Sequence, residues 1–135
     1  MLRTLAAGLL VSMLAACGTT PVDPSRAPRL ETSFVMDPTL LQSAPEKSSI
    51  RVVRDSGAWG SAVDILLYLD GRHIASINAN RVLQIWVPPG AHKVGMQSFN
   101  AAYPVTYLDV TTRAGEVADF RVYQDGSDWQ FVRLK

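Results

Sequence analysis

Short apolar runs separated by turn residues fill the chain from Ser49 onward, and this pattern limits the fold more than any other feature. In residues 63–70 apolar side chains recur at every second position, which is the period of a strand with one buried face. Asp70-Gly71 follows, a strong hairpin signal because both turn positions must tolerate positive φ. The same pattern predicts strands at residues 50–54, 63–69, 72–77, 82–87, 92–99, 106–112, 117–123 and 129–134.

No stretch after Ser49 keeps a helical period. Short strands at close spacing predict an all-β fold, either a sandwich or a small barrel. We favour a small antiparallel two-sheet β-sandwich, prealbumin-like or immunoglobulin-like, over residues 49–135. In its later strands, the side chains expected to face the core are Leu83, Ile85, Val87, Leu108, Val110, Ala118, Phe120 and Val122.

The first 16 residues have the three-part layout of a secretory signal peptide. Arg3 supplies the positive charge, and residues 5–14 are uncharged and mostly apolar. This run is too short to span a bilayer, because a spanning helix takes about 20 apolar residues. It ends in Leu14, Ala15, Ala16 and Cys17, and these four residues resemble the bacterial lipobox, in which Leu, a small residue and Ala or Gly precede a Cys.

The lipobox resemblance implies that residues 1–16 are removed and that the Cys17 thiol carries a diacylglycerol, with the new amine usually acylated too. Each buried methylene contributes about 0.8 kcal/mol and one chain binds only marginally, so two or three chains give lasting attachment. The alternative is an ordinary cleaved signal, which leaves the chain's only cysteine as an unexplained free thiol. Gly18 stands where an Asp favours inner-membrane retention, so the resemblance implies the outer membrane, facing the periplasm.

Without the signal the chain is neutral. Loss of Arg3 leaves 12 basic and 12 acidic residues, against 13 and 12 in the full sequence. Nucleic-acid binding requires a basic footprint, so this balance argues against nucleic acid and against electrostatic docking on anionic lipid. With Cys17 committed to lipid, no disulfide is possible, and core packing must stabilise the domain.

Residues 17–48 are predicted to be a disordered tether between the lipid and the sandwich. Prolines deny the backbone the donors that strands and helices use, and a flexible chain of this length reaches roughly 30 Å, enough to lift the domain above the headgroups. An apolar piece, residues 34–41, interrupts the tether. We expect it to pack on the domain or to form one short helical turn near Pro38–Leu41; the alternative is a docking segment for a partner. The prolines of the tether are Pro21, Pro24, Pro28, Pro38 and Pro45.

Two hairpin segments resemble a recurrent module of bacterial envelope proteins. Residues 67–75 end a strand in Asp-Gly, and residues 83–94 contain a Pro-Gly-x-His turn. Over residues 49–99 this arrangement is similar to the PEGA-type repeat and to uncharacterised lipoprotein domains, with Val87-Pro88-Pro89-Gly90-Ala91 in place of the Pro-Glu-Gly-Ala motif. The resemblance implies a sandwich and brings no catalytic residues.

The residues that could carry chemistry are scattered, so we expect no enzyme, no metal and no cofactor. Zinc sites take three or four ligands, and only His73 and His92 are available, each at a strand end. A nucleophilic serine needs a base beside it, and Ser61, Ser76 and Ser98 have none nearby in sequence. Gly57 and Gly60 lack the lysine of a phosphate-binding loop. The acids Asp64, Asp109 and Asp119 each fit an outward strand position.

Large aromatic side chains are the best candidates for a binding surface. Trp59 lies in a glycine loop, while Tyr68, Trp86 and Tyr123 fall opposite the apolar faces of their strands. Such rings can anchor a protein partner or stack on sugars; otherwise the tether or a loop covers them. We therefore predict a lipid-anchored, non-enzymatic adaptor or accessory component of a periplasmic assembly, or alternatively a peptidoglycan-binding module that uses Trp59, Tyr68 and Trp86. An enzyme is the weakest possibility.

Overall fold

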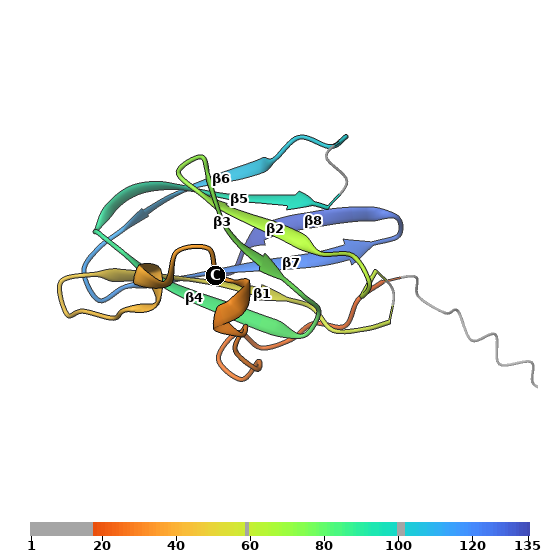
Figure 1. Cartoon of the computed structure of the whole chain (residues 1–135), viewed down its shortest axis with the longest axis horizontal. Helices are drawn as coiled ribbons and strands as arrows, with labels where there is room; N and C mark the ends of the chain where they lie inside the picture. The colour runs from red at the N-terminus through yellow and green to blue at the C-terminus, as the bar shows by residue number, and fades with distance from the viewer. Residues whose placement is uncertain (1–17, 59, 100–101) are drawn as a thin grey trace, which may run out of the picture.

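The protein is a β-sandwich of two four-stranded sheets (Figure 1). The computed structural model describes residues 18–58, 60–99 and 102–135. In the first sheet the order is β4 (Arg81–Val87), β1 (Ser48–Arg54), β7 (Val117–Asp125) and β8 (Asp128–Arg133). In the second sheet the order is β3 (Arg72–Ile77), β2 (Ile65–Leu69), β5 (Gly90–Ser98) and β6 (Thr106–Thr112). The predicted all-β sandwich is confirmed.

The hairpin turns follow from the local sequence. Asp70 and Gly71 have φ values of +49° and +84° and connect β2 to β3, as the Asp-Gly pair predicts. Asn80 precedes β4 with φ +57°, a conformation that Asn tolerates better than most residues. Local turn chemistry therefore places strand ends close to their predicted positions.

One strand pair departs from the antiparallel expectation. β1 and β7 are parallel neighbours, with Ser49 opposite Val117 and Arg54 opposite Val122. The chain between them forms the whole second sheet and β4, and then re-enters the first sheet in the direction of β1. Side chains alternate with period two in parallel and antiparallel strands alike, so the sequence pattern does not distinguish the two pairings.

The core lies between the sheets. The predicted inward side chains of β4 and β7 are buried, as is Val110, while Leu108 is partly buried against the core. Phe120 and Phe131 pack with their ring centroids 5.5 Å apart. Burial of each such side chain contributes about 1.5–3 kcal/mol to the stability of the domain.

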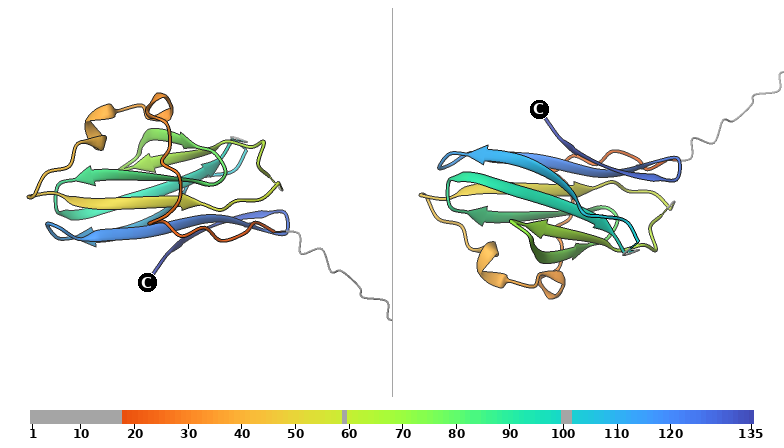
Figure 2. Two further views of the ribbon diagram at one scale, coloured as in Figure 1. Left: turned by 90° about the horizontal axis from the view of Figure 1, so that it is seen from below. Right: turned by 90° about the horizontal axis from the view of Figure 1, so that it is seen from above.

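The predicted disordered tether is wrong for residues 18–48, because this segment packs along the sandwich (Figure 2). Leu30 and Val35 belong to the core cluster. The Leu30 amide donates to the Val82 carbonyl at 2.8 Å, and the Met36 amide donates to the Ile74 carbonyl at 2.8 Å. Val82 lies in β4 and Ile74 in β3, so the segment supplies partners to an edge strand of each sheet, which would otherwise expose unpaired groups.

Two 3₁₀ turns, η1 (Thr32–Phe34) and η2 (Pro38–Leu41), lie within this segment. The expected packing and the short helical turn near Pro38–Leu41 are thus confirmed. Leu40 and Leu41 pack against the core cluster. Asp37 caps η2 by accepting a hydrogen bond from the Thr39 amide at 3.1 Å. The prolines are accommodated because the segment pairs at isolated bridges rather than through a continuous ladder.

Candidate functional site

Several residues singled out by the sequence lie outside the described part of the chain. These are the lipobox residues Leu14, Ala15 and Ala16, the proposed lipid attachment residue Cys17, and Trp59. Within the described ranges, no helix is long and apolar enough to cross a membrane. Of the predicted binding surface, the structure therefore describes Tyr68 and Trp86.

Tyr68 and Trp86 do not form one surface. Tyr68 is a half-buried residue of β2, between the buried Leu67 and Leu69, so it faces away from the core on the second sheet. Trp86 is a half-buried residue of β4 and lies on the outer face of the first sheet. The sandwich separates the two rings, which means that a single flat ligand cannot stack on both.

Tyr68 is held by its neighbours. Its hydroxyl donates to Gln97 Oε1 at 2.9 Å, and its ring centroid lies 5.4 Å from His73 and 6.4 Å from Tyr107. Gly95 leaves room for the Tyr107 ring, because a Cβ at this position would come within 2.7 Å of it. The outer face of the second sheet therefore carries a small packed group formed by the rings of Tyr68, His73 and Tyr107. Of these three, the strand pattern indicated only Tyr68 as part of a binding surface.

The histidines and acids lie apart. His73 Nε2 is 3.0 Å from the Ala75 carbonyl, whereas His92 contacts Asp70 Oδ2 at 2.8 Å and the Pro88 carbonyl at 2.7 Å. Asp119 accepts from Arg51 at 2.6 Å, and Asp109 accepts from Lys93 at 2.9 Å. Among the described residues, no three His, Cys, Asp or Glu side chains come close enough together to hold a metal ion.

A cavity of about 500 Å³ lies between the loop that precedes β6 and the start of β8. It brings together Tyr103, from the loop before β6, and Trp129, from β8, with polar side chains around them. No local pattern marks this site, because Tyr103 lies in a loop without a periodic pattern and Trp129 is 26 positions further along the chain. The other lining residues are Val63, Met96, Gln97, Ser98, Pro104, Thr106, Ser127, Asp128 and Gln130.

Arg54 fixes the Trp129 wall of this cavity. This arginine is only 1% exposed, and its guanidinium lies 4.9 Å from the Trp129 ring centroid. It donates to the Ile77 carbonyl at 2.7 Å and to the Gly60 carbonyl at 2.8 Å. Burial lowers the pKa of Arg54 to about 10, so the guanidinium remains charged at neutral pH. A buried cation with two carbonyl acceptors thus orients the ring.

The first described residues are fastened to the same end of the sandwich. We call Gly18–Thr20 the anchor segment, because it follows Cys17 directly. Gly18 forms a β-bridge with Asp125, and Thr20 exchanges two backbone hydrogen bonds with Ser56, at 2.8 and 3.0 Å. The Thr19 hydroxyl donates to Asp55 Oδ2 at 2.9 Å and accepts from the Gln124 amide at 3.1 Å.

Asp55 makes this attachment stronger than surface contacts alone would. Its side chain is fully buried and accepts two hydrogen bonds from Arg121, at 2.8 and 2.6 Å. These bonds raise the pKa of Arg121, whose guanidinium also lies 4.2 Å from the Tyr123 ring centroid. Because a buried carboxylate that loses a donor is costly, Thr19 is held as part of a satisfied polar network.

Comparison of the chain with protein-family models and with curated proteins gives no match.

Proposed function

We propose that this chain is a lipid-anchored, non-enzymatic protein of the bacterial cell envelope. It is attached through acyl chains on Cys17 to the inner leaflet of the outer membrane, faces the periplasm, and acts as an adaptor or accessory component of a periplasmic assembly. The PEGA-like hairpin pattern and the lipobox are the sequence support for this role.

The observation that carries the proposal is the position of Gly18. A signal cut after Ala16 would leave Cys17 as the first residue, and the next residue already pairs with Asp125. The described fold therefore begins two residues after the predicted cleavage position, and this supports a mature chain that starts at Cys17.

Metabolic labelling tests the anchor. Bacteria that produce the chain are grown with labelled palmitate, and the wild type is compared with Cys17→Ser. We expect label on the wild type and none on the variant. Gly18→Ala is the matched control, because a Cβ at Gly18 meets only the Gln124 carbonyl oxygen, at 3.4 Å, and Cys17 is kept. Equal labelling of wild type and Cys17→Ser would contradict the anchor.

The adaptor role is tested separately. Acylated protein is recovered from a detergent extract of the producing cells, and proteins that co-purify are compared with those recovered by Cys17→Ser. A partner bound in defined proportion to the acylated chain supports the role. Turnover of an envelope substrate by the purified protein, with no partner recovered, would replace it with an enzyme.

Glycan binding is the second candidate, and the cavity between β6 and β8 favours it. Tyr103 and Trp129 offer ring faces, while Gln97, Asp128 and Gln130 offer the planar polar groups that recognise sugar hydroxyls. Sedimentation with purified peptidoglycan tests this candidate. We expect Tyr103→Ala to reduce binding, with Tyr107→Ala as the control on the outer face of the second sheet. Binding that instead falls with Trp59→Ala or Trp86→Ala would place the site where the sequence alone suggested.

A further inference from the structure

Loops from both sheets meet at the end of the sandwich that holds Gly18. The parallel strands β1 and β7 both end there, and β2 begins there opposite the end of β5, with Ile65 paired to Ser98. Figure 1 shows the β7–β8 turn and the start of the described chain together at the right-hand end. We call this the anchor end. Its described residues are Gly18–Thr20, Gly60–Asp64, Phe99, Ala102–Val105 and Asp125–Asp128.

The anchor segment is bonded directly to this end, so no free linker separates it from the residue that follows Cys17. Its hydrogen bonds reach Asp55 and Ser56, directly after β1, and Gln124, near the end of β7. Consecutive Cα atoms are about 3.8 Å apart, so Cys17 lies within one residue's length of Gly18. Acyl chains on Cys17 must therefore enter a bilayer directly beside the anchor end.

The most exposed large apolar side chains of the described chain lie at this end. Phe99 is 68% exposed and Tyr103 is 63% exposed, more than any other large apolar residue there, and Val63 is also exposed. The Phe99 amide donates to the Asp64 carbonyl at 3.0 Å, which places Phe99 beside the Val63 loop. Gln97 Nε2 donates to the Tyr103 carbonyl at 2.8 Å and holds the second ring. Exposed aromatic rings are the side chains that membrane interfaces favour.

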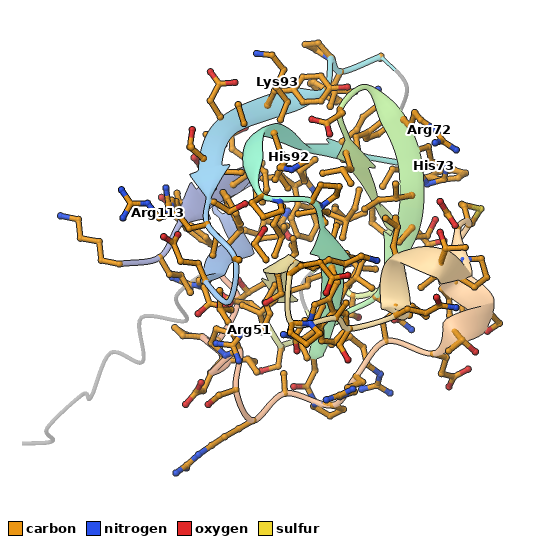
Figure 3. The ribbon with its side chains drawn as sticks, turned by 90° about the vertical axis from the view of Figure 1, so that its left-hand side faces the viewer. Arg51, Arg72, His73, His92, Lys93 and Arg113 are labelled. Carbon is orange, nitrogen blue, oxygen red and sulfur yellow. The ribbon has the colours of Figure 1, made fainter. Side chains whose placement is uncertain are left out.

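The exposed charges among the residues named as the anchor end are acidic: Asp64, Asp125 and Asp128. Of the cations in the adjoining strands, Arg54 is buried, Arg121 is paired with Asp55, and Arg81 begins β4 opposite Arg54. Figure 3 views the opposite end, where His92 pairs with Asp70, Lys93 with Asp109 and Arg113 with Glu116. The anchor end thus fits a zwitterionic lipid surface through apolar contacts, whereas anionic lipid would repel its carboxylates.

We propose that the anchor end rests on the membrane surface, with Phe99, Tyr103 and Val63 at the boundary between headgroups and acyl chains. This inference rests on the lipid anchor of the proposed function. β7 has nine residues at about 3.3 Å each, so the opposite end stands roughly 30 Å above the bilayer and is the part presented to the periplasm.

Site-specific fluorescence quenching tests the orientation. Cys17 is the only cysteine and is acylated in the lipidated protein, so a new cysteine can be labelled selectively. Tyr103→Cys at the anchor end and Arg113→Cys at the opposite end, where the side chain is 90% exposed, are each labelled and reconstituted. The vesicles contain phosphatidylethanolamine and phosphatidylcholine with a nitroxide-headgroup lipid. We expect quenching several-fold stronger at position 103 than at position 113, and Phe99→Cys should behave like Tyr103→Cys.

Vesicle flotation separates the two possible failures. Acylated protein that does not float with the vesicles would contradict the lipid anchor itself. Protein that floats but shows equal quenching at positions 103 and 113, or none at positions 99 and 103, would overturn the orientation and leave the anchor intact. Labels at 99 and 103 that are shielded only when a soluble envelope protein is added would assign this end to a protein partner instead.

Discussion

At the scale of single residues, burial decides how strongly a polar side chain affects the stability of the sandwich. Arg54 points between the sheets from the same face of β1 as Ile50 and Val52, which belong to the apolar core. It is accommodated because two carbonyls and the Trp129 ring surround the guanidinium. A single residue thus links the end of β1 to β3, to the Gly60 loop and to the wall of the cavity.

Replacement of Arg54 by lysine should lower the free energy of unfolding by about 2–4 kcal/mol, because one ammonium cannot serve both carbonyls and leaves a buried acceptor unpaired. Urea unfolding followed by tryptophan fluorescence measures the change. Arg51→Lys is the control. Arg51 pairs with Asp119 on the partly exposed outer face, so its replacement should cost less than about 1 kcal/mol. Equal effects of the two substitutions would contradict the structural role of Arg54.

The Asp70–His92 pair predicts a pH dependence. Burial alone would lower the pKa of His92, but hydrogen bonds to Asp70 and the Pro88 carbonyl outweigh it and raise this pKa above 6.5. Burial alone would raise the pKa of Asp70, but hydrogen bonds from His92 and the Lys93 amide outweigh it and lower this pKa below 3.8. The contribution of His92 to the free energy of unfolding is complete below pH 6.5 and is lost as pH rises through its raised pKa. The contribution of Asp70 is present above pH 3.8 and is lost on acidification below that pH.

The stability difference between wild type and Asp70→Asn should therefore be largest between about pH 4 and pH 6.5 and should shrink toward pH 8. Its size should not exceed about 1 kcal/mol, because the Asp70 side chain is 48% exposed and water screens the pair. Asparagine is the matched substitution, since it tolerates the positive φ at this position. Urea unfolding at pH 5.5 and pH 8 measures the difference, and a difference that grows with pH would contradict the assignment.

At the scale of elements, residues 18–48 act as part of the sandwich. They give partners to β3 and β4, the strands at one edge of each sheet, and they add Leu30 and Val35 to the core. Their prolines and polar residues resemble a linker in composition, yet a few apolar side chains at the right places are enough to dock the segment. The segment thereby protects two edges that could otherwise pair with other chains.

Truncation of Leu30 tests this role. Leu30→Ala should lower the free energy of unfolding by about 2–4 kcal/mol, because it leaves a cavity where the segment meets the core. Met36→Ala removes a side chain of similar size that is 54% exposed, and it should change the stability by no more than about 0.5 kcal/mol. Thermal or urea unfolding of both variants measures the contrast. A neutral Leu30→Ala would mean that the segment is a free tether after all.

At the scale of the whole molecule, the two ends of the sandwich differ in exposed apolar surface. The anchor end holds Gly18, Phe99 and Tyr103, while the ion pairs of Lys93 and Arg113 lie about 30 Å away at the opposite end. A chain attached at Cys17 would hold one end against the membrane and offer the other to the periplasm. Residue 18 then affects both the docking of the anchor segment and the membrane to which the protein is delivered.

Gly18→Asp tests the delivery. If the chain follows the sorting rule that the resemblance to a lipobox implies, the variant should move from the outer-membrane to the inner-membrane fraction, because in that rule Asp after the lipidated Cys favours retention. Gly18→Ala should stay in the outer membrane. Density-gradient fractionation of the two membranes, with immunodetection of the chain, measures the shift. An identical distribution of wild type and Gly18→Asp would contradict outer-membrane sorting by this signal.

By itself, the sequence determined the strands, most of their inward faces and the hairpin turns, because strand periodicity and turn chemistry act over a few residues. Asp70-Gly71 and the alternating residues of β4 needed no distant partner to be recognised. Tertiary structure alone decided that β1 and β7 run parallel, that Leu30 and Val35 complete the core, that Tyr68 and Trp86 face apart, and that Tyr103 meets Trp129. These outcomes depend on which surfaces remain unpaired once the sheets have formed, and contacts between residues far apart in the chain leave no local pattern.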